Sequence, residues 1–251
     1  MSKRSKIKKA EPIKSKSRFV EALKWADPFT YVDLLLAKLF GEPDSTGKKV
    51  LFWIVYLLFA FLFAFLLYKL FGLIFGVSMP FATVVSGSME PTFYRGDIII
   101  INAPNHLKAE VATIDENIVN QDIKDFARMY YEPNEYGLYQ IDRIVINNQL
   151  YNLNDIVDKD NSVIIYPSNT KGIPIIHRVA LIIEANDGTF YITKGDNIKT
   201  NRIIDEDCNI DTNGIPQNGC LHMYPIADKE LLGKKIGRIP YLGYIKLFLF
   251  G

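Results

Sequence analysis

The residues with the clearest capacity for chemistry are a serine beside a glycine and a histidine far along the chain. Ser88 lies in the segment Ser-Gly-Ser-Met-Glu-Pro-Thr that begins at residue 86, and His177 lies in Ile-Ile-His-Arg-Val. A serine hydroxyl is a weak nucleophile unless a nearby base takes its proton during attack. Imidazole can act as that base at neutral pH. The pair therefore predicts nucleophilic catalysis, provided that the fold brings the two side chains together.

Both residues also have a purely structural interpretation. A serine in such a turn can cap a helix or belong to a linker. A histidine at the start of an apolar strand is often a core residue, and His177 is followed at a spacing of two by Val179, Leu181 and Ile183, which we predict to share its face. The presence of a candidate serine partner favours the catalytic interpretation.

An apolar run precedes the serine. Residues 50–68 read VLFWIVYLLFAFLFAFLLY and contain no charged side chain. Such a run can cross a hydrocarbon core of about 30 Å as a helix, and it continues to Val77 if Lys69 extends its amine to the interface. A buried core helix would be unusual in a domain this small, and the run exceeds the apolar part of a normal cleaved signal peptide. We therefore predict a transmembrane anchor over residues 49–77.

Charge is distributed unevenly about this anchor. The formal net charge is +1, so nucleic acid is not a predicted partner, but twelve basic residues stand against six acidic ones before residue 50. This excess predicts that residues 1–48 are a cytoplasmic tail and that residues 78–251 lie on the far side of the membrane. Residues 29–40 have apolar positions at helical spacing, which predicts an amphipathic helix on the cytoplasmic membrane face or a short helix without a particular partner.

The chain beyond residue 78 has the pattern of strands. Residues 97–101, 162–166, 175–184 and 189–193 are apolar, β-branched runs bounded by turn residues. The last two flank Ala-Asn-Asp-Gly, which is typical of a hairpin turn. We predict a β-rich, mainly antiparallel, barrel-like domain that follows the N-terminal transmembrane helix.

Other parts of this domain carry weaker signals. Residues 102–160 are polar and rich in asparagine, and we predict a variable insertion between two core strands. Within them, residues 122–131 suggest a short helix and residues 144–146 a strand followed by an Asn-Asn turn. Residues 239–251 are apolar but too few to span a membrane, so they form either a final strand or an apolar edge at the bilayer surface.

The cysteines and the remaining histidines give no metal site. Cys208 and Cys220 lack the spacing to each other and to histidine that a zinc site needs, and no metal or cofactor is predicted. The two cysteines form a disulfide if this half of the chain lies outside the cytoplasm, or they remain two thiols. His106 and His222 lie in polar contexts, and we predict that both are surface residues.

Several motifs together resemble those of type I signal peptidases. Ser86–Thr92 followed by Gly96-Asp97-Ile-Ile-Ile resembles the nucleophile box of that family. Ile176–Val179 matches the second box and residues 190–197, which end in Lys-Gly-Asp-Asn, match the third. Gly237–Gly243 resembles the closing segment. The resemblance is specific over residues 84–101 and 162–198 and absent over the first 45 residues.

The resemblance implies a role for each matched residue. Ser88 is the expected nucleophile and His177 the expected general base. Bacterial members place a lysine at the base position, so this chain resembles the histidine-type branch of archaea and the endoplasmic reticulum. The Ser86 hydroxyl and the Ser88 amide are the expected oxyanion-hole donors.

The third catalytic residue is less clear, because the chain departs from the family pattern. Histidine-type members carry a second aspartate shortly after Gly-Asp-Asn, and it orients the histidine. The closest matching spacing here falls on Arg202. The role therefore falls on Asp205 if a small insertion is accommodated, or more of it falls on Asp196. We expect Asp207 to be farther from His177 than either.

The resemblance implies a membrane-bound serine endopeptidase that removes N-terminal signal peptides from exported preproteins. The expected substrates carry small side chains at the first and third positions before the cleaved bond. The expected partners are secretory preproteins, the lipid membrane and, if the enzyme works in a complex, other membrane subunits. The membrane would be the cell membrane, or that of the endoplasmic reticulum with a lumenal catalytic domain. The alternative is a catalytically silent, anchored β-domain that binds a protein partner, and the joint presence of Ser88, His177 and Gly-Asp-Asn argues against it.

Overall fold

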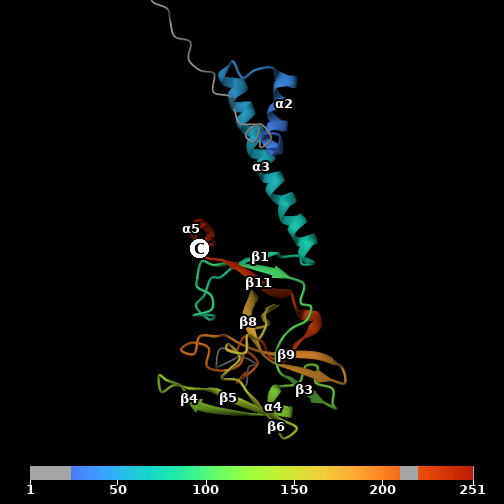
Figure 1. Ribbon diagram of the computed structural model, residues 1–251, viewed down its shortest axis with the longest axis vertical. Coiled ribbons are helices and arrows are strands. Elements are labelled where there is room, and N and C mark those ends of the chain that lie inside the picture. The colour runs from blue at the N-terminus through green and yellow to red at the C-terminus, as the bar shows by residue number, and fades with distance from the viewer. Residues whose placement is uncertain (1–23, 210–219, 251) are drawn as a thin grey trace, which may run out of the picture. The chain divides into compact units, whose positions relative to one another are not determined.

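The computed structural model describes residues 24–209 and 220–250. The chain divides between residues 67 and 68 into two compact units. The first unit contains helix α2 (Pro28–Phe40) and most of helix α3 (Thr46–Phe75), and the second contains the end of α3 and every described strand (Figure 1).

Helix α2 confirms the helix predicted over residues 29–40. The Asp27 carboxylate caps its first turn, and Gly41 ends it with a φ of 72°, a conformation that glycine adopts at little cost. Val32 and Leu36 pack against Phe52 of α3. One apolar face of α2 therefore has a partner within the first unit, whereas Leu34, Leu35 and Leu39 are exposed.

Helix α3 confirms the helix predicted over the apolar run. Its 30 residues give a length of about 45 Å at 1.5 Å per residue. The mean hydropathy of its most apolar window is 2.8, and only 6% of that window is buried. Leaving so much apolar surface in water would be costly. By length and composition α3 can therefore cross a membrane.

The second unit is built on a main sheet. Its strands follow the order β1–β2–β11–β7–β8–β9–β10, and β3 pairs with β8 beside this path. The pairs are antiparallel except for the parallel pair β3–β8. The strands are β1 (Phe81–Thr83), β2 (Ile98–Asn102), β3 (Val111–Ile114), β7 (Val163–Pro167), β8 (Pro174–Ala185), β9 (Gly188–Lys194), β10 (Ile226–Ala227) and β11 (Gly233–Ile239). The predicted β-rich, mainly antiparallel fold class is confirmed, as are the four predicted strands.

Most of the predicted insertion, residues 102–160, forms a second sheet, whereas its strand β3 pairs with β8 of the main sheet. Helix α4 (Ile123–Phe126) leads into strands β4 (Ala127–Pro133), β5 (Tyr139–Ile146) and β6 (Gln149–Asn152), which lie at the end of the domain away from β1 and β11 in Figure 1. The helix predicted over residues 122–131 is therefore wrong beyond Phe126, because the following residues pair with β5. The strand predicted over 144–146 is confirmed.

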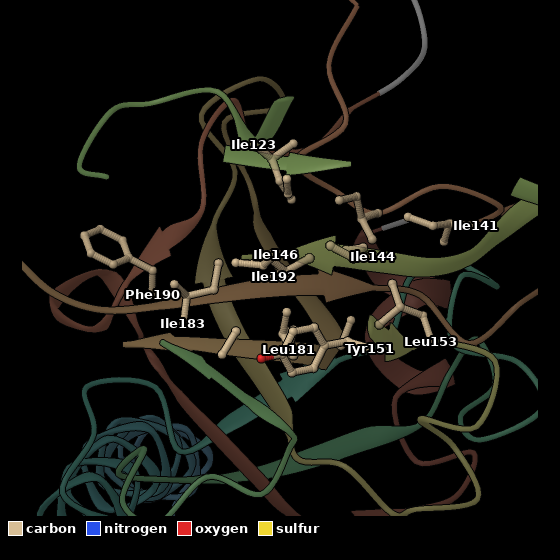
Figure 2. Close-up of a cluster of buried hydrophobic side chains, with 14 of the residues drawn as sticks. Ile123, Ile141, Ile144, Ile146, Tyr151, Leu153, Leu181, Ile183, Phe190 and Ile192 are labelled. Carbon is tan, nitrogen blue, oxygen red and sulfur yellow. The ribbon is translucent and has the colours of Figure 1, made fainter. Parts of the chain in front are cut away.

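The two sheets share the largest apolar core. Ile144 and Ile146 of β5 belong to the same buried cluster as Ile183 of β8 and Ile192 of β9 (Figure 2). Each of these side chains is nearly or fully buried. The polar residues of the insertion thus belong to its outer surface. Its apolar inner face packs against the β8–β9 hairpin, which carries His177.

Strand β8 contains a β-bulge that changes which residues share a face with His177. Its register with β9 shifts between Val179 and Leu181. Val179 packs in one apolar cluster, whereas Leu181 and Ile183 pack in another. The prediction that all three lie on the face of His177 is therefore wrong for Leu181 and Ile183, because one extra residue reverses the alternation.

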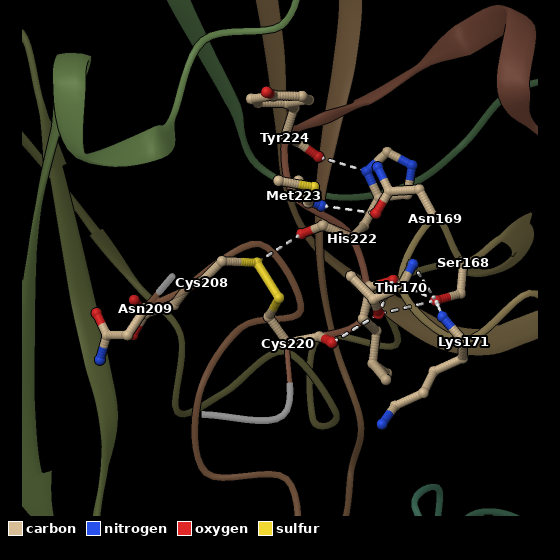
Figure 3. The surroundings of a disulfide bond; sticks show 12 residues. Ser168, Asn169, Thr170, Lys171, Cys208, Asn209, Cys220, His222, Met223 and Tyr224 are labelled. Carbon is tan, nitrogen blue, oxygen red and sulfur yellow. Dashed lines mark hydrogen bonds between the residues drawn. A yellow bond between two sulfur atoms is a disulfide. The ribbon is translucent and has the colours of Figure 1, made fainter. Parts of the chain in front are cut away.

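The structure excludes one alternative for the C-terminal residues and selects one of the two for the cysteines. Strand β11 ends at Ile239 and is followed by helix α5 (Tyr244–Phe250), so the segment is not a final strand. Cys208 and Cys220 form a disulfide (Figure 3).

The two remaining histidines have different environments. His106 is exposed, as predicted. His222 is only 3% exposed, and its Nδ1 lies 2.7 Å from the Tyr224 carbonyl oxygen. The surface prediction for His222 is therefore wrong. The ring packs edge-on against Tyr166, which a polar local sequence does not reveal.

Candidate active site

The candidate nucleophile lies in the loop between β1 and β2. Met89 and Phe93, on either side of a short turn, are nearly fully buried and pack with Ile99 and Ile101 of β2. Ser88 itself is half-buried. Its Oγ lies 3.2 Å from the Ser86 Oγ, so the two hydroxyls face one another. Two apolar anchors thus fix a loop that presents both predicted serines.

The Gly-Asp-Asn motif holds this loop from the other side. The Asn197 amide donates to the Ser88 carbonyl oxygen at 2.9 Å, and its side-chain nitrogen donates to the Gly87 carbonyl at 2.8 Å. A Cβ on Gly195 would lie only 2.7 Å from the Ser88 carbonyl oxygen. Glycine is therefore required at this close approach. The motif positions the Ser88 loop instead of supplying a catalytic group from its glycine or asparagine.

Asp196 pairs with an arginine. Its two carboxylate oxygens accept hydrogen bonds from Nε and Nη2 of Arg178 at 2.8 and 2.7 Å. Thr92 donates to the same carboxylate at 2.5 Å, and Arg178 also donates to the Asn161 carbonyl at 2.6 Å. Within the described residues no hydrogen bond joins Asp196 to His177. This buried, bidentate pair ties β8 to the Ser88 loop.

The segment that follows β11 also contacts the loop between β1 and β2. The Asp97 carboxylate accepts hydrogen bonds from the amides of Tyr94 and Tyr241 at 3.0 and 3.2 Å. Gly96 has a φ of 89°, and a Cβ there would lie 2.3 Å from the Tyr244 ring. These contacts connect Gly96-Asp97 to the residues after β11.

His177 is paired with Asp205. The ring is 1% exposed, and its Nδ1 lies 2.6 Å from Oδ2 of Asp205. In the register of β7 and β8, His177 stands opposite Ile164. An imidazole whose Nδ1–H donates to a carboxylate has a free Nε2 lone pair, which is the tautomer that can accept a serine proton.

The structure shows how the chain accommodates the residues before Asp205. Hydrogen bonds from the amides of Thr200 and Asn201 to the Asn197 carbonyl close a turn directly after Gly-Asp-Asn. The Asp205 amide then donates to the Thr193 carbonyl at 2.9 Å, beside the last strand of the hairpin. Asp205 thereby reaches His177 although its sequence spacing departs from the family pattern.

Asp207 lies in a different environment. Its carboxylate forms a 3.0 Å ion pair with Lys124 and accepts a short hydrogen bond from the Tyr131 hydroxyl. Burial and the Asp207 charge raise the pKa of Tyr131. These partners belong to the insertion, and Asp207 connects the segment after Asp205 to the second sheet.

Ser88 and His177 line one cavity of about 300 Å³. Its remaining lining is largely apolar and includes Val84, Met89, Phe93, Ile173, Ile175, Ile176 and Leu221. In the described residues no hydrogen bond joins Ser88 to His177 directly. Catalytic hydrogen bonds in unliganded enzymes are often loose and tighten when substrate binds.

Sequence reasoning missed three buried residues around Asp205. Tyr166, Thr193 and Glu206 all lie within hydrogen-bond distance of Asp205 or of one another. Two signals were present in the sequence: a tyrosine ends the strand predicted over 162–166, and a glutamate directly follows Asp205. Neither signal indicates burial by itself.

Comparison with known proteins gives a consistent result. No family model matches the chain. The signal peptidase complex catalytic subunit sec11 of Schizosaccharomyces pombe is 26% identical over 184 residues, which cover 72% of this chain and 73% of that protein. The SEC11 subunit of Plasmodium falciparum is 24% identical over 72% of this chain and 65% of its own length. Human SEC11C is 22% identical over 84% of this chain and 79% of its own length.

Ser88 and His177 thus line one largely apolar cavity, and Asp205 contacts the His177 ring beside it. The chain is a homologue of the catalytic subunits of signal peptidase complexes, of the type found in eukaryotes. The family resemblance noted in the sequence is thereby confirmed.

Proposed function

We propose that this chain is a membrane-anchored serine endopeptidase that cleaves signal peptides from preproteins, with Ser88 as the nucleophile and His177 as the general base. The observation that carries the proposal is the shared cavity: Ser88 and His177 line it together, and Asp205 binds the far side of the His177 ring. Homology to signal peptidase catalytic subunits over most of the chain supports the same reaction.

The geometry supports acylation of Ser88 as the first step. His177 Nε2 takes the Ser88 proton while Oγ attacks the carbonyl carbon of the scissile peptide bond. Asp205 stabilises the imidazolium that forms. The peptide C–N bond then breaks as the imidazolium gives its proton to the leaving amine, which leaves the signal peptide as an ester on Ser88.

Deacylation reuses the same groups. A water molecule loses its proton to His177 and attacks the ester carbonyl, and the proton returns to Ser88 Oγ as the bond breaks. In both steps the negative oxygen needs donors aimed at it. We assign these to the Ser88 amide, which donates to no acceptor within the described residues, and to the Ser86 hydroxyl beside it.

The cavity suits an extended peptide with small apolar side chains. Its walls are largely aliphatic and aromatic, and its lining includes Thr83, the last residue of β1, and the following Val84 and Val85. A volume of about 300 Å³ has room for short side chains near Ser88. This agrees with small residues at the first and third positions before the cleaved bond.

We also propose an orientation in the membrane. Residues 1–48 lie in the cytoplasm, residues 49–77 cross the membrane, and residues 78–251, which include the catalytic site, lie outside the cytoplasm. Two observations support this orientation. Basic residues accumulate before α3, and Cys208 and Cys220 are joined in a disulfide, which is typical of oxidising compartments. The relatives are named as subunits of a complex, and we extend that to this chain: membrane subunits are its expected partners.

The direct test is cleavage of a preprotein by the purified full-length chain in detergent or proteoliposomes. We expect one new N-terminus, identified by mass spectrometry, directly after the signal peptide. A preprotein with a bulky residue at the position before the cleaved bond is the matched control and is expected to remain intact. Failure to cleave any signal-peptide-bearing substrate, alone or with its complex subunits, would contradict the proposal.

Protease protection tests the orientation. The chain, tagged at both ends, is placed in sealed vesicles whose outer face is the non-cytoplasmic face of the membrane. Added protease is expected to remove the C-terminal tag and to spare the N-terminal tag, because only residues beyond α3 are exposed. Protection of the C-terminal tag, with digestion after detergent is added, would overturn the orientation.

A further inference from the structure

One oxygen of the Asp205 carboxylate has an unusual number of partners. Besides Nδ1 of His177 at 2.6 Å, Oδ2 lies 2.6 Å from the Tyr166 hydroxyl and 2.7 Å from the Thr193 hydroxyl. All three partners and Asp205 are buried. Tyr166 comes from β7, His177 from β8 and Thr193 from β9, so three neighbouring strands converge on one atom.

The direction of these hydrogen bonds follows from the available protons. Each hydroxyl has one proton, and the Asp205 carboxylate accepts only, so Tyr166 and Thr193 both donate to Oδ2. Thr193 Oγ1 also lies 3.0 Å from the Tyr166 hydroxyl oxygen and 3.0 Å from Oε1 of Glu206. Because the Tyr166 and Thr193 protons are both used on Asp205, a hydrogen bond between Thr193 and Glu206 needs a proton on Glu206.

Glu206 has the surroundings of a neutral acid. It is fully buried, and its carboxyl oxygens accept hydrogen bonds from the Thr193 amide at 3.1 and 3.2 Å. Burial, and then the neighbouring Asp205 charge, raise the pKa of Glu206 well above its ordinary value. Burial likewise raises the pKa of Tyr166, which therefore remains a donor.

We propose that Tyr166 and Thr193 are positioning residues that hold the Asp205 carboxylate against the His177 ring, and that Glu206 donates to Thr193 and so fixes the direction of its hydroxyl. The chain of donors runs from Glu206 to Thr193 to Asp205. None of the three lines the cavity beside Ser88, so they act through Asp205 and not on the substrate. This inference rests on the proposed function.

The test measures kcat and KM for the preprotein whose cleavage defines the proposed function. Thr193→Val and Tyr166→Phe preserve shape and remove one donor each. Each is expected to lower kcat roughly 10-fold, within the range that a hydrogen bond to a charged group carries, and to leave KM unchanged. Thr193→Ser is expected to restore kcat because it restores the hydroxyl.

Tyr191→Phe is the matched control for removing a tyrosine hydroxyl. Tyr191 is buried in the same apolar cluster as Tyr166, but its hydroxyl donates to Asp228 at 2.7 Å. We expect its kcat to match that of the wild-type chain. Thermal unfolding of every variant identifies any loss of kcat that comes from misfolding. If Thr193→Val does not fold, Tyr166→Phe alone tests the inference.

A double-mutant cycle separates positioning from general support. In an Asp205→Asn background, Tyr166→Phe and Thr193→Val are expected to cause no further loss of the residual kcat, because they act through that carboxylate. A loss as large as in the wild-type background, or wild-type kcat in both single variants, would overturn the inference. If the wild-type chain itself cleaves nothing, it is the proposed function that fails.

Glu206→Gln tests the neutral acid independently of activity. Both Glu206 and glutamine can donate to Thr193, but only Glu206 can ionise. In the unfolded chain Glu206 loses its proton above a pH of about 4.3, whereas in the folded chain it keeps it. The contribution of Glu206 to the free energy of unfolding therefore falls as the pH rises above about 4.3. The gain in unfolding temperature of Glu206→Gln over wild type is therefore expected to grow from pH 4 to pH 7.

Other titratable groups around this cluster also affect how the unfolding temperature depends on pH. They are Asp205 and His177, Lys194 of β9, whose pKa burial lowers, and His222, whose ring packs edge-on against Tyr166. The substitution removes none of these groups, so the wild-type chain and the variant differ only at residue 206. A constant or shrinking difference with rising pH would show that Glu206 is ionised in the folded chain and would contradict its role as donor.

Discussion

Ser88→Ala is expected to abolish preprotein cleavage while the protein remains folded and inserted in the membrane. The hydroxyl is the group that forms the ester with the substrate, and its removal leaves only the donors that bind the oxyanion. Loss of the nucleophile in a serine protease lowers kcat by a factor on the order of 10⁶. Product formation over a long incubation, quantified by mass spectrometry, measures the residual rate.

Ser86→Ala is the matched control for this variant. It removes a neighbouring hydroxyl 3.2 Å away in the same loop, so any general disturbance of the loop should be similar. If Ser86 is one of two oxyanion donors, its loss is expected to cost about 10²–10³-fold in kcat, far less than the loss of Ser88. Normal cleavage by Ser88→Ala would show that another group is the nucleophile.

Local patterns in the sequence were sufficient to predict the hairpin that carries His177 and the long helix that precedes the Ser88 loop. The hairpin of β8 and β9 has two long apolar, β-branched runs around Ala-Asn-Asp-Gly, and the structure has the strands and the turn there. The uncharged run before Ser88 likewise predicted α3. In each case the signal extends over many adjacent residues, and tertiary contacts do not reverse it.

Other features depend on contacts between distant segments, which local patterns do not contain. Residues 127–131 suggest a helix in isolation, yet they complete a sheet with β5. His222 lies in a polar segment, yet the disulfide at Cys220 and the ring of Tyr166 enclose it. The bulge in β8 reverses the alternation on which the predicted face of His177 was based.

Which aspartate pairs with His177 also depends on contacts between distant segments, so local patterns did not decide it. The motif Gly-Asp-Asn suggested a role for Asp196 beside His177, but its charge neutralises Arg178. The family spacing falls on Arg202, so Asp205 fits the orienting role only if a small insertion is accommodated. What decides between them is a backbone hydrogen bond from Asp205 to Thr193, which returns the chain to the hairpin after the turn at Asn197.

Asp205→Asn is expected to lower kcat by a factor on the order of 10²–10⁴, the scale on which a triad carboxylate acts. The asparagine side chain has the same shape but no charge, so the imidazolium formed during attack loses its counter-charge. Its amide group can also donate to Nδ1 of His177, which selects the tautomer that cannot accept the Ser88 proton. The measurement is kcat for preprotein cleavage, with KM and the unfolding temperature determined for the same sample.

Asparagine substitutions at the other two aspartates distinguish this role from a structural one. Asp207→Asn is expected to retain activity, because Asp207 pairs with Lys124 of α4 and Tyr131 of β4, away from His177. Asp196→Asn leaves the buried Arg178 without its counter-charge, which costs about 3–5 kcal/mol of stability when a buried pair is broken. Its activity is therefore expected to fall together with its unfolding temperature, whereas Asp205→Asn should lose kcat at a much smaller cost in stability. Near-normal kcat in Asp205→Asn would mean that Ser88 and His177 work as a dyad, and that Asp205 has no part in the reaction.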